Sequence, residues 1–177
     1  MDTSAFDSLM ASRDAPMAIV TTCVDGERAG CLVGFHGQSS IEPRRYSVWL
    51  SKANHTFRVA LHAEHLGVHL LTEADRDLAE LFGTNSGDDV DKFALCDWGS
   101  TPEGVPALTR CPNMFVGRRT GLFDDGGDHV CFVTEPVVVL AAGAFVPLWL
   151  SEVDDLTPGH DVQERPSPLT ERAHGPA

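Results

Sequence analysis

The pattern of apolar and polar residues along the chain predicts a mainly β protein. Met17–Val24 is a β-branched apolar run that ends at Asp25-Gly26, a dipeptide typical of tight hairpin turns. The chain is therefore expected to return as a paired strand over Ala29–Val33. Similar short apolar runs bounded by turn residues predict six further strands. They are Tyr46–Leu50, Gly67–Leu71, Met114–Arg119, Val130–Thr134, Val137–Ala141 and Phe145–Leu150.

Short helices are predicted between some of these strands. Each has apolar residues at helical spacing behind a polar capping residue. One opens with a Thr-x-x-Asp capping box and is expected to end at a glycine. The three segments are Phe6–Met10 behind Ser4, Asn54–Ala63, and Thr72–Phe82 before Gly83.

Roughly eight short strands at this spacing, with two or three inserted helices, favour a closed antiparallel β-barrel. A doubly wound sheet needs a regular alternation of strand and helix, which this chain lacks. Residues 1–153 are expected to form one domain. Residues 154–177 hold several prolines and charges and are expected to form an extended or partly disordered C-terminal arm.

The composition argues against several classes of function. The net charge of -13 has the wrong sign for a nucleic-acid binder or for an anionic membrane surface. No apolar stretch approaches the ~18 residues of a membrane span. The five cysteines are odd in number and include no Cys-x-x-Cys, so free thiols are expected. The polar N-terminus has no export signal, and together these features favour a cytoplasmic location.

Metal chemistry and the common nucleotide motifs are disfavoured. His62 and His65 lie three residues apart, and His69 follows on a different predicted element, but no carboxylate or cysteine set completes a ligand pattern. The chain also lacks Gly-x-Gly-x-x-Gly, a Walker-type Gly-Lys-Ser and a nucleophile elbow. We therefore expect no metal site.

The first segment with chemical potential is the predicted loop Val33–Ser40. Its two glycines, Gly34 and Gly37, let a backbone approach a ligand closely. Gln38, the serines and the main-chain amides offer hydrogen bonds to the edge of a flat ring. The same residues would equally suit a wide corner of a barrel.

The second segment is Lys52-Ala-Asn-His-Thr56, at the predicted start of a helix. The free N–H groups there, with Lys52, Arg58 and the Thr56 hydroxyl, would suit a phosphate. Alternatively, Asn54 is an ordinary helix cap with solvated neighbours.

The third segment is Gly126-Gly-Asp-His129, which leads into an apolar strand. Asp128 could orient the imidazole of His129 at the mouth of the barrel. Alternatively, the segment is a hairpin turn with two exposed polar side chains.

Taken in chain order, these segments resemble the flavin reductase family, whose members share an FMN-binding split barrel. The resemblance runs from about Pro16 to Leu150. Its elements are Ile19-Val-Thr-Thr22, Ser40-Ile-Glu-Pro43, Lys52-x-Asn-x-Thr56, Asp77-Leu-Ala-x-x-Phe82, Asp91-Lys-Phe93, Val105-Pro-Ala-Leu108 and Gly127-Asp-His129. It implies NAD(P)H-dependent reduction of FMN or FAD by a homodimer with flavin at the subunit interface. It also implies that the reduced flavin could supply a monooxygenase component.

The resemblance assigns roles to individual residues. His129, supported by Asp128, is the implied catalytic residue near the nicotinamide. The flavin phosphate is assigned to the segment at the helix start. Lys92 and Phe93 are expected to approach the flavin, and they could do so from the partner subunit. The implied cofactor-binding residues are Val33, Gly34, Phe35, Gln38, Ser39 and Ser40 for the ring, Lys52, Asn54, His55 and Thr56 for the phosphate, and Lys92 and Phe93.

Departures from the family pattern leave alternatives open. Leu32, Gly34 and Arg44 stand where family members often carry a hydroxyl, an amide or a proline. The choice between FMN and FAD, and between NADH and NADPH, therefore stays open. Other activities fit the same barrel: a deazaflavin-dependent reductase, an oxidase of the pyridoxamine-phosphate type, or a non-catalytic flavin or haem carrier.

Overall fold

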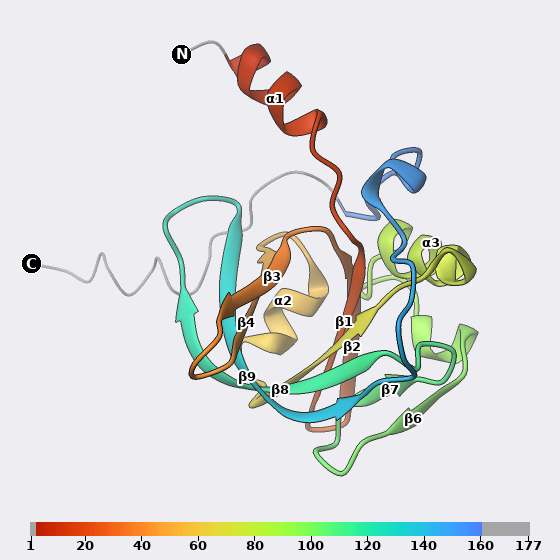
Figure 1. Ribbon diagram of the computed structural model, residues 1–177. Helices are drawn as coiled ribbons and strands as arrows, with labels where there is room; N and C mark the ends of the chain where they lie inside the picture. The colour runs from red at the N-terminus through yellow and green to blue at the C-terminus, as the bar shows by residue number, and fades with distance from the viewer. Residues whose placement is uncertain (1–2, 161–177) are drawn as a thin grey trace, which may run out of the picture.

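The computed structural model describes residues 3–160, and a curved antiparallel sheet of seven strands forms its centre (Figure 1). The strand order is β2-β1-β5-β8-β9-β4-β3, so β2 and β3 are the two edges. The mainly β prediction is confirmed, but the sheet is a half-barrel with open edges where spacing alone predicted a closed one. The strands are β1 Ala18–Val24, β2 Glu27–Val33, β3 His36–Ser40, β4 Arg45–Ser51, β5 His65–Leu70, β8 Met114–Phe123 and β9 His129–Leu140.

The concave side of the sheet is filled by helix α2, His55–Ala60 (Figure 1). Phe57 is 1% exposed and meets Phe132 edge-on, with 6.1 Å between ring centres. Burying an aromatic side chain of this size contributes about 1.5–3 kcal/mol. The predicted helix is therefore present, although shorter than expected, and it packs into the main core.

β1 is buried on both faces. Ala18 and Val20 point into the core around α2, whereas Met17 and Ile19 join a second core beneath helix α3, Arg76–Thr84. This double burial explains why the run has no polar alternation. The hairpin from β1 to β2 also turns at Asp25-Gly26 as predicted, with positive φ values of 50° and 85°.

The prediction of a loop over Val33–Ser40 is wrong for the second half of that segment. His36–Ser40 is strand β3, which pairs with β4. Only Gly34 and Phe35 connect β2 to β3. The sequence gives no sign of this strand because its residues are polar. A strand at a sheet edge with exposed residues does not need an apolar face.

The two strands predicted over Val130–Thr134 and Val137–Ala141 are one strand of 12 residues, β9. Pro136 does not break it because the pairing with β8 shifts register there, and a bulge tolerates a residue without an N–H. The strand predicted at Phe145–Leu150 is also wrong. That segment makes only isolated bridges, from Trp149 to Pro16 and from Pro147 to Thr72.

The flanking helices match the prediction in place but not in their ends. Helix α1 spans Thr3–Ala11, so it begins before the expected cap Ser4. Helix α3 runs through Gly83, which was expected to end it. A Cβ at Gly83 would lie 2.9 Å from Cδ2 of Leu32, so this glycine permits close packing of α3 on β2.

Smaller elements complete the described chain. A hairpin of β6, Trp98–Ser100, and β7, Pro106–Leu108, was not predicted, nor were the 3-10 turns Lys92–Leu95 and Leu150–Glu152. The capping box does form, at the 3-10 turn Glu73–Asp75 that leads into α3: Asp75 accepts hydrogen bonds from the N–H and hydroxyl of Thr72. None of the helices within residues 3–160 is long and apolar enough to cross a membrane.

The start of the predicted C-terminal arm is ordered against the domain. Gly159 donates a hydrogen bond to the carbonyl of Gly83, and Asp155 binds Arg76. The rest of the predicted arm, residues 161–177, lies outside the described residues.

Candidate functional site

Four of the sequence-predicted residues meet at one end of strands β3, β4 and β9. We call this group, with one further residue, the mouth cluster: Phe35, Lys52, Asp124, Asp128 and His129. The β4–β9 register places Ser51 opposite His129, and the Lys52 N–H donates to the carbonyl of Asp128 at 2.8 Å. Asp124 belongs to the loop between β8 and β9, which folds back onto the end of β4.

His129 is held between a carboxylate and an aromatic ring. Its Nδ1 lies 2.8 Å from Oδ1 of Asp128, and its ring meets Phe35 edge-on at 5.3 Å between centres. The hydrogen bond from His129 lowers the pKa of the Asp128 carboxyl below its usual range. Because Asp128 accepts from Nδ1, the Nε2 atom is the one left to face a ligand. The orienting role predicted for Asp128 therefore has the required geometry.

Lys52 is paired inside the protein. Its Nζ lies 2.9 Å from Oδ1 of Asp124, and the two side chains are only 7% and 10% exposed. Asp124 was not singled out from sequence. The only signal for it was an acidic pair, Asp124-Asp125, directly before the glycines of the turn.

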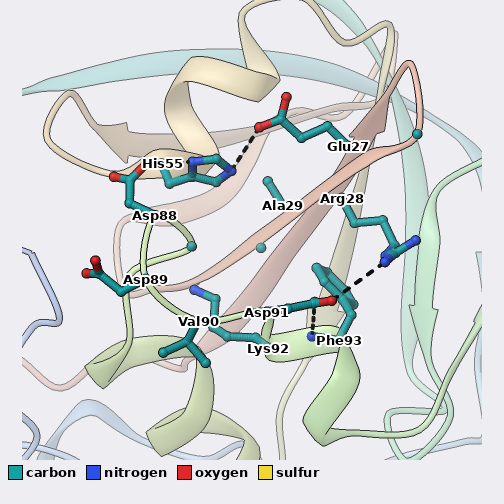
Figure 2. Close-up of a pocket in the computed structure, with 13 residues that line it drawn as sticks. Glu27, Arg28, Ala29, His55, Asp88, Asp89, Val90, Asp91, Lys92 and Phe93 are labelled. Carbon is teal, nitrogen blue, oxygen red and sulfur yellow. Dashed lines mark hydrogen bonds and ion pairs between the residues drawn. The ribbon is translucent and has the colours of Figure 1, made fainter.

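A separate pocket of about 330 Å³ lies between the start of β2, the start of α2 and the loop 87–93 (Figure 2). We call it the acidic pocket because four carboxylates line it, against two permanent cations. His55 bridges two of the carboxylates, with Nε2 3.2 Å from Glu27 and Nδ1 3.1 Å from Asp88. The lining includes Glu27, Arg28, His55, Asp88, Asp89, Asp91, Lys92 and Phe93.

Lys92 and Phe93 lie in the wall of this pocket and are almost fully buried. Nζ of Lys92 donates to the carbonyl of Asn85 at 2.9 Å and lies over the ring of Phe82. Burial lowers the pKa of the Lys92 ammonium. Phe93 is 4% exposed and packs edge-on against Phe82 and Trp98, so within one chain it is a core residue.

The four residues expected to hold a phosphate point in different directions. Asn54 caps α2 by accepting from the N–H of Thr56, which supports the capping interpretation. The hydroxyl of Thr56 is buried and has no oxygen or nitrogen partner among the described residues; it lies beside the thiol of Cys31. Lys52 faces the mouth cluster, and His55 faces the acidic pocket.

Three of the residues expected to line a flavin ring, Gln38, Ser39 and Ser40, lie on the edge strand β3. Val33 ends β2 and is buried in the main core, and Gly34 and Phe35 connect the two strands. Gln38 and Ser39 are exposed on β3, and Gln38 donates to the carbonyl of Ser40. The Ser39 hydroxyl accepts from Ser47 on β4. β3 pairs with β4 on one side only, so its other side offers main-chain N–H and C=O groups.

An apolar surface next to the mouth cluster was also missed. Trp49, Cys131 and Phe123 are register partners across β4, β9 and β8, so their side chains lie on the same face. Phe35 and Phe123 are 64% and 65% exposed, and Trp49 is 38% exposed. Aromatic side chains on two strands and a connection cannot be assigned to one surface until the pairing register is known.

No cluster of three metal-ligating side chains occurs in the part of the chain that the structure describes. His62 and His65 do not share a helix face, because α2 ends at Ala60 and His65 begins β5. His69 is instead a buried structural residue. Its two ring nitrogens bond to the carbonyl of Ile19 and the N–H of Leu108.

Residues 10–151 match the model of the flavin reductase like domain. The chain belongs to this family. The match covers the whole half-barrel, the mouth cluster and the acidic pocket, so the resemblance seen in the sequence motifs is confirmed for the family.

Named relatives of this flavin reductase-like chain are reductase subunits. It is 27% identical over 128 residues to the reductase subunit of the stachydrine N-demethylase of Rhizobium meliloti, covering 70% of this chain and 54% of that protein. It is 24% identical over 129 residues to the reductase subunit of a flavin-dependent monooxygenase of Mycobacterium tuberculosis, covering 73% and 67%. The chain thus spans about half the length of the first relative.

The fold is shared with solved structures. The NADH:FAD oxidoreductase of Streptomyces globisporus superposes with a TM-score of 0.75 at 18% identity, covering 94% of each chain. At that identity the likeness establishes the half-barrel architecture.

Proposed function

We propose that this chain is an NAD(P)H-dependent flavin reductase that transfers hydride to FMN or FAD. The observation that carries the proposal is the contact of Phe35 with His129, itself held by Asp128, at an exposed end of the sheet. An oriented imidazole beside an exposed aromatic ring suits a site where flat rings stack. Membership of the flavin reductase-like family supports the same conclusion.

The residues present fit a flavin ring. The free edge of β3 offers main-chain donors and acceptors of the kind that the carbonyl and nitrogen edge of the ring requires. Val33–Phe35 and Gln38–Ser40 would hold the ring, with Phe35 against its apolar part.

When bound, the flavin itself supplies the hydride-accepting chemistry. His129 would present Nε2 to the nicotinamide and position it over the ring, while Asp128 keeps the imidazole in one orientation. Phe35 would exclude water from the reacting face. No strong acid–base pair is needed for this reaction.

We further propose that the active form is a homodimer with the flavin at the subunit interface. The exposed aromatic residues Phe35, Trp49 and Phe123 lie next to the mouth cluster and form an apolar face of the kind that interfaces bury. In such a dimer, the partner subunit's Lys92 and Phe93 would lie near the flavin. The relatives named as reductase subunits support a role in supplying reduced flavin to a monooxygenase component.

The proposal is tested by measuring NADH and NADPH oxidation by the purified protein with and without added FMN or FAD. We expect nicotinamide oxidation that depends on flavin and saturates with it. A protein that binds flavin but leaves both nicotinamides untouched would instead be a flavin carrier or use another donor. A protein that binds no flavin would contradict the proposal entirely.

A further inference from the structure

We propose that Asp124 competes with the flavin phosphate for Lys52, and that it thereby sets how far this site distinguishes phosphorylated from unphosphorylated flavins. The inference rests on the proposed function and on the assignment of the flavin phosphate to Lys52, which the family resemblance implies. It names a residue that determines which flavin is held.

The ion pair of Lys52 and Asp124 is formed before any ligand arrives. Nζ of Lys52 lies 2.9 Å from Oδ1 of Asp124, and both side chains are at least nine-tenths buried. A buried charge without a partner is strongly unfavourable, so the two groups hold each other in place. The positive charge of Lys52 is therefore already balanced by the carboxylate of Asp124 in the free protein.

The backbone fixes both ends of this pair. The N–H of Gly126 donates to Oδ1 of Asp124 at 2.9 Å, which holds the carboxylate within its own turn. The N–H of Lys52 donates to the carbonyl of Asp128, which ties the same loop to the end of β4. The loop thus holds the carboxylate of Asp124 against the ammonium of Lys52.

The other basic side chains at the start of α2 also have carboxylate partners. His55 lies between Glu27 and Asp88, and Arg58 forms an ion pair with Asp88. The hydrogen bond from Arg58 is the main reason that the pKa of Asp88 is lowered. A phosphate near α2 therefore meets basic side chains that already have carboxylate partners, and only Nη1 of Arg58 among them is buried without a hydrogen-bond partner in the described residues.

The consequence is an exchange of partners when a phosphorylated flavin binds. A phosphate monoester carries a charge of about -1.5 to -2 at neutral pH. It must displace Asp124 from Lys52 or lie beside that carboxylate, so the favourable new ion pair is offset by the loss of the old one. Riboflavin, which has the same ring and no phosphate, does not require this exchange.

The test compares the dissociation constants of FMN and riboflavin in the wild-type protein and in Asp124→Asn. Asparagine keeps the size and a hydrogen-bond acceptor but removes the competing charge. We expect FMN to bind about tenfold to a hundredfold more tightly in Asp124→Asn, the range of one charge-assisted hydrogen bond, and riboflavin to bind as before. An unchanged ratio of the two constants would overturn the inference.

Two further variants make the comparison specific. Asp125→Asn removes an equal charge from the neighbouring exposed residue, and it should leave the ratio unchanged if the effect comes from the pair and not from the overall charge of the loop. Combining Asp124→Asn with Lys52→Met should abolish the gain, because Asp124 acts through Lys52. A gain that persists without Lys52 would contradict the assigned route.

The wild-type protein alone provides a second measurement should Asp124→Asn fail to fold. With Lys52 already paired, the wild-type constants for FMN and riboflavin should lie within about tenfold of each other, less than one full charge-assisted bond. A preference for FMN above a hundredfold would overturn the inference. These results are separate from the proposed function: absence of all flavin binding defeats the proposed function, whereas binding with the wrong ratio defeats only the role of Asp124.

Discussion

The ring of Phe35 meets the imidazole of His129 edge-on, with 5.3 Å between ring centres. Phe35 lies in the connection between β2 and β3, whereas His129 begins β9, 94 positions further along the chain (129 − 35). Strands β3, β4 and β9 bring them together because β4 pairs with both of its neighbours. This contact combines a stacking surface with an oriented hydrogen-bonding group, and it is the basis of the reductase proposal.

Replacing His129 should impair turnover more than flavin binding. In His129→Ala the flavin ring keeps Phe35 and the β3 edge, but the nicotinamide loses its positioning group, so we expect kcat for NAD(P)H oxidation to fall about tenfold or more. The flavin dissociation constant should change by less than about threefold, below the effect of one hydrogen bond. Asp128→Asn, which keeps an acceptor for Nδ1 but not the charge, should give a smaller fall. Steady-state kinetics and flavin titration of the same samples measure both quantities.

Replacing Lys52 should have the opposite profile. Lys52→Met keeps the apolar stem but removes the ammonium, and it leaves the Asp124 carboxylate to repel a phosphate. We expect FMN binding to weaken by about 1–3 kcal/mol, with riboflavin binding little changed. Equal losses for FMN and riboflavin would show that Lys52 supports the fold and not the phosphate. Thermal unfolding of the variant, followed in parallel, separates the two effects.

Removing an apolar side chain from the exposed aromatic surface should prevent dimer formation. Phe123→Glu places a charge on a residue that is 65% exposed in one chain, so the isolated subunit should fold normally. If the surface is the subunit interface, the variant should be a monomer by sedimentation or light scattering and should bind flavin weakly. Val146→Glu, at a residue that is also 65% exposed but lies outside both this surface and the loop 87–93, is the matched control. A variant Phe123→Glu with wild-type mass and affinity would place the interface elsewhere.

His69 should make the protein sensitive to mild acid. Burial lowers its pKa to about 4 from the ordinary 6.5, and its two ring nitrogens are bonded to main-chain groups of Ile19 and Leu108. Between pH 6.5 and 4 the unfolded chain therefore binds a proton that the folded chain does not, so stability is complete above 6.5 and falls as the pH drops. The loss approaches about 3 kcal/mol at the lower end.

Denaturant unfolding at a series of pH values tests this expectation. His69→Gln removes the titrating ring but keeps a donor and an acceptor, so its stability should fall less steeply over the same interval than that of the wild-type protein. Identical slopes would mean that other groups, chiefly carboxylates, account for the acid sensitivity.

The sequence was sufficient for those parts of the fold that depend on local chemistry. The β1–β2 hairpin follows from Asp25-Gly26 between two apolar runs, and the Thr72–Asp75 capping box places α3. β3 could not be predicted, because its residues are polar and none of them is buried. The single long β9 was missed for a related reason: Pro136 normally breaks a strand, and only the register shift opposite β8 makes it tolerable.

The same distinction between local and long-range information applies to the candidate site. Asp128 next to His129 is a local signal, and the structure has the predicted geometry. The pairing of Lys52 with Asp124 joins positions 72 residues apart (124 − 52), and no local pattern reveals it. The aromatic face of Trp49 and Phe123 likewise depends on strand register. Long-range pairing was therefore the information that the linear pattern lacked.

The central claim is tested most directly by a single-turnover experiment. The protein is loaded with FMN or FAD in the absence of oxygen and mixed rapidly with NADH, and then with NADPH, while flavin absorbance is recorded. We predict that flavin bleaches with one of the nicotinamides much faster than free flavin does, and that His129→Ala slows this step. Bleaching at the rate of free flavin with both nicotinamides would contradict the account.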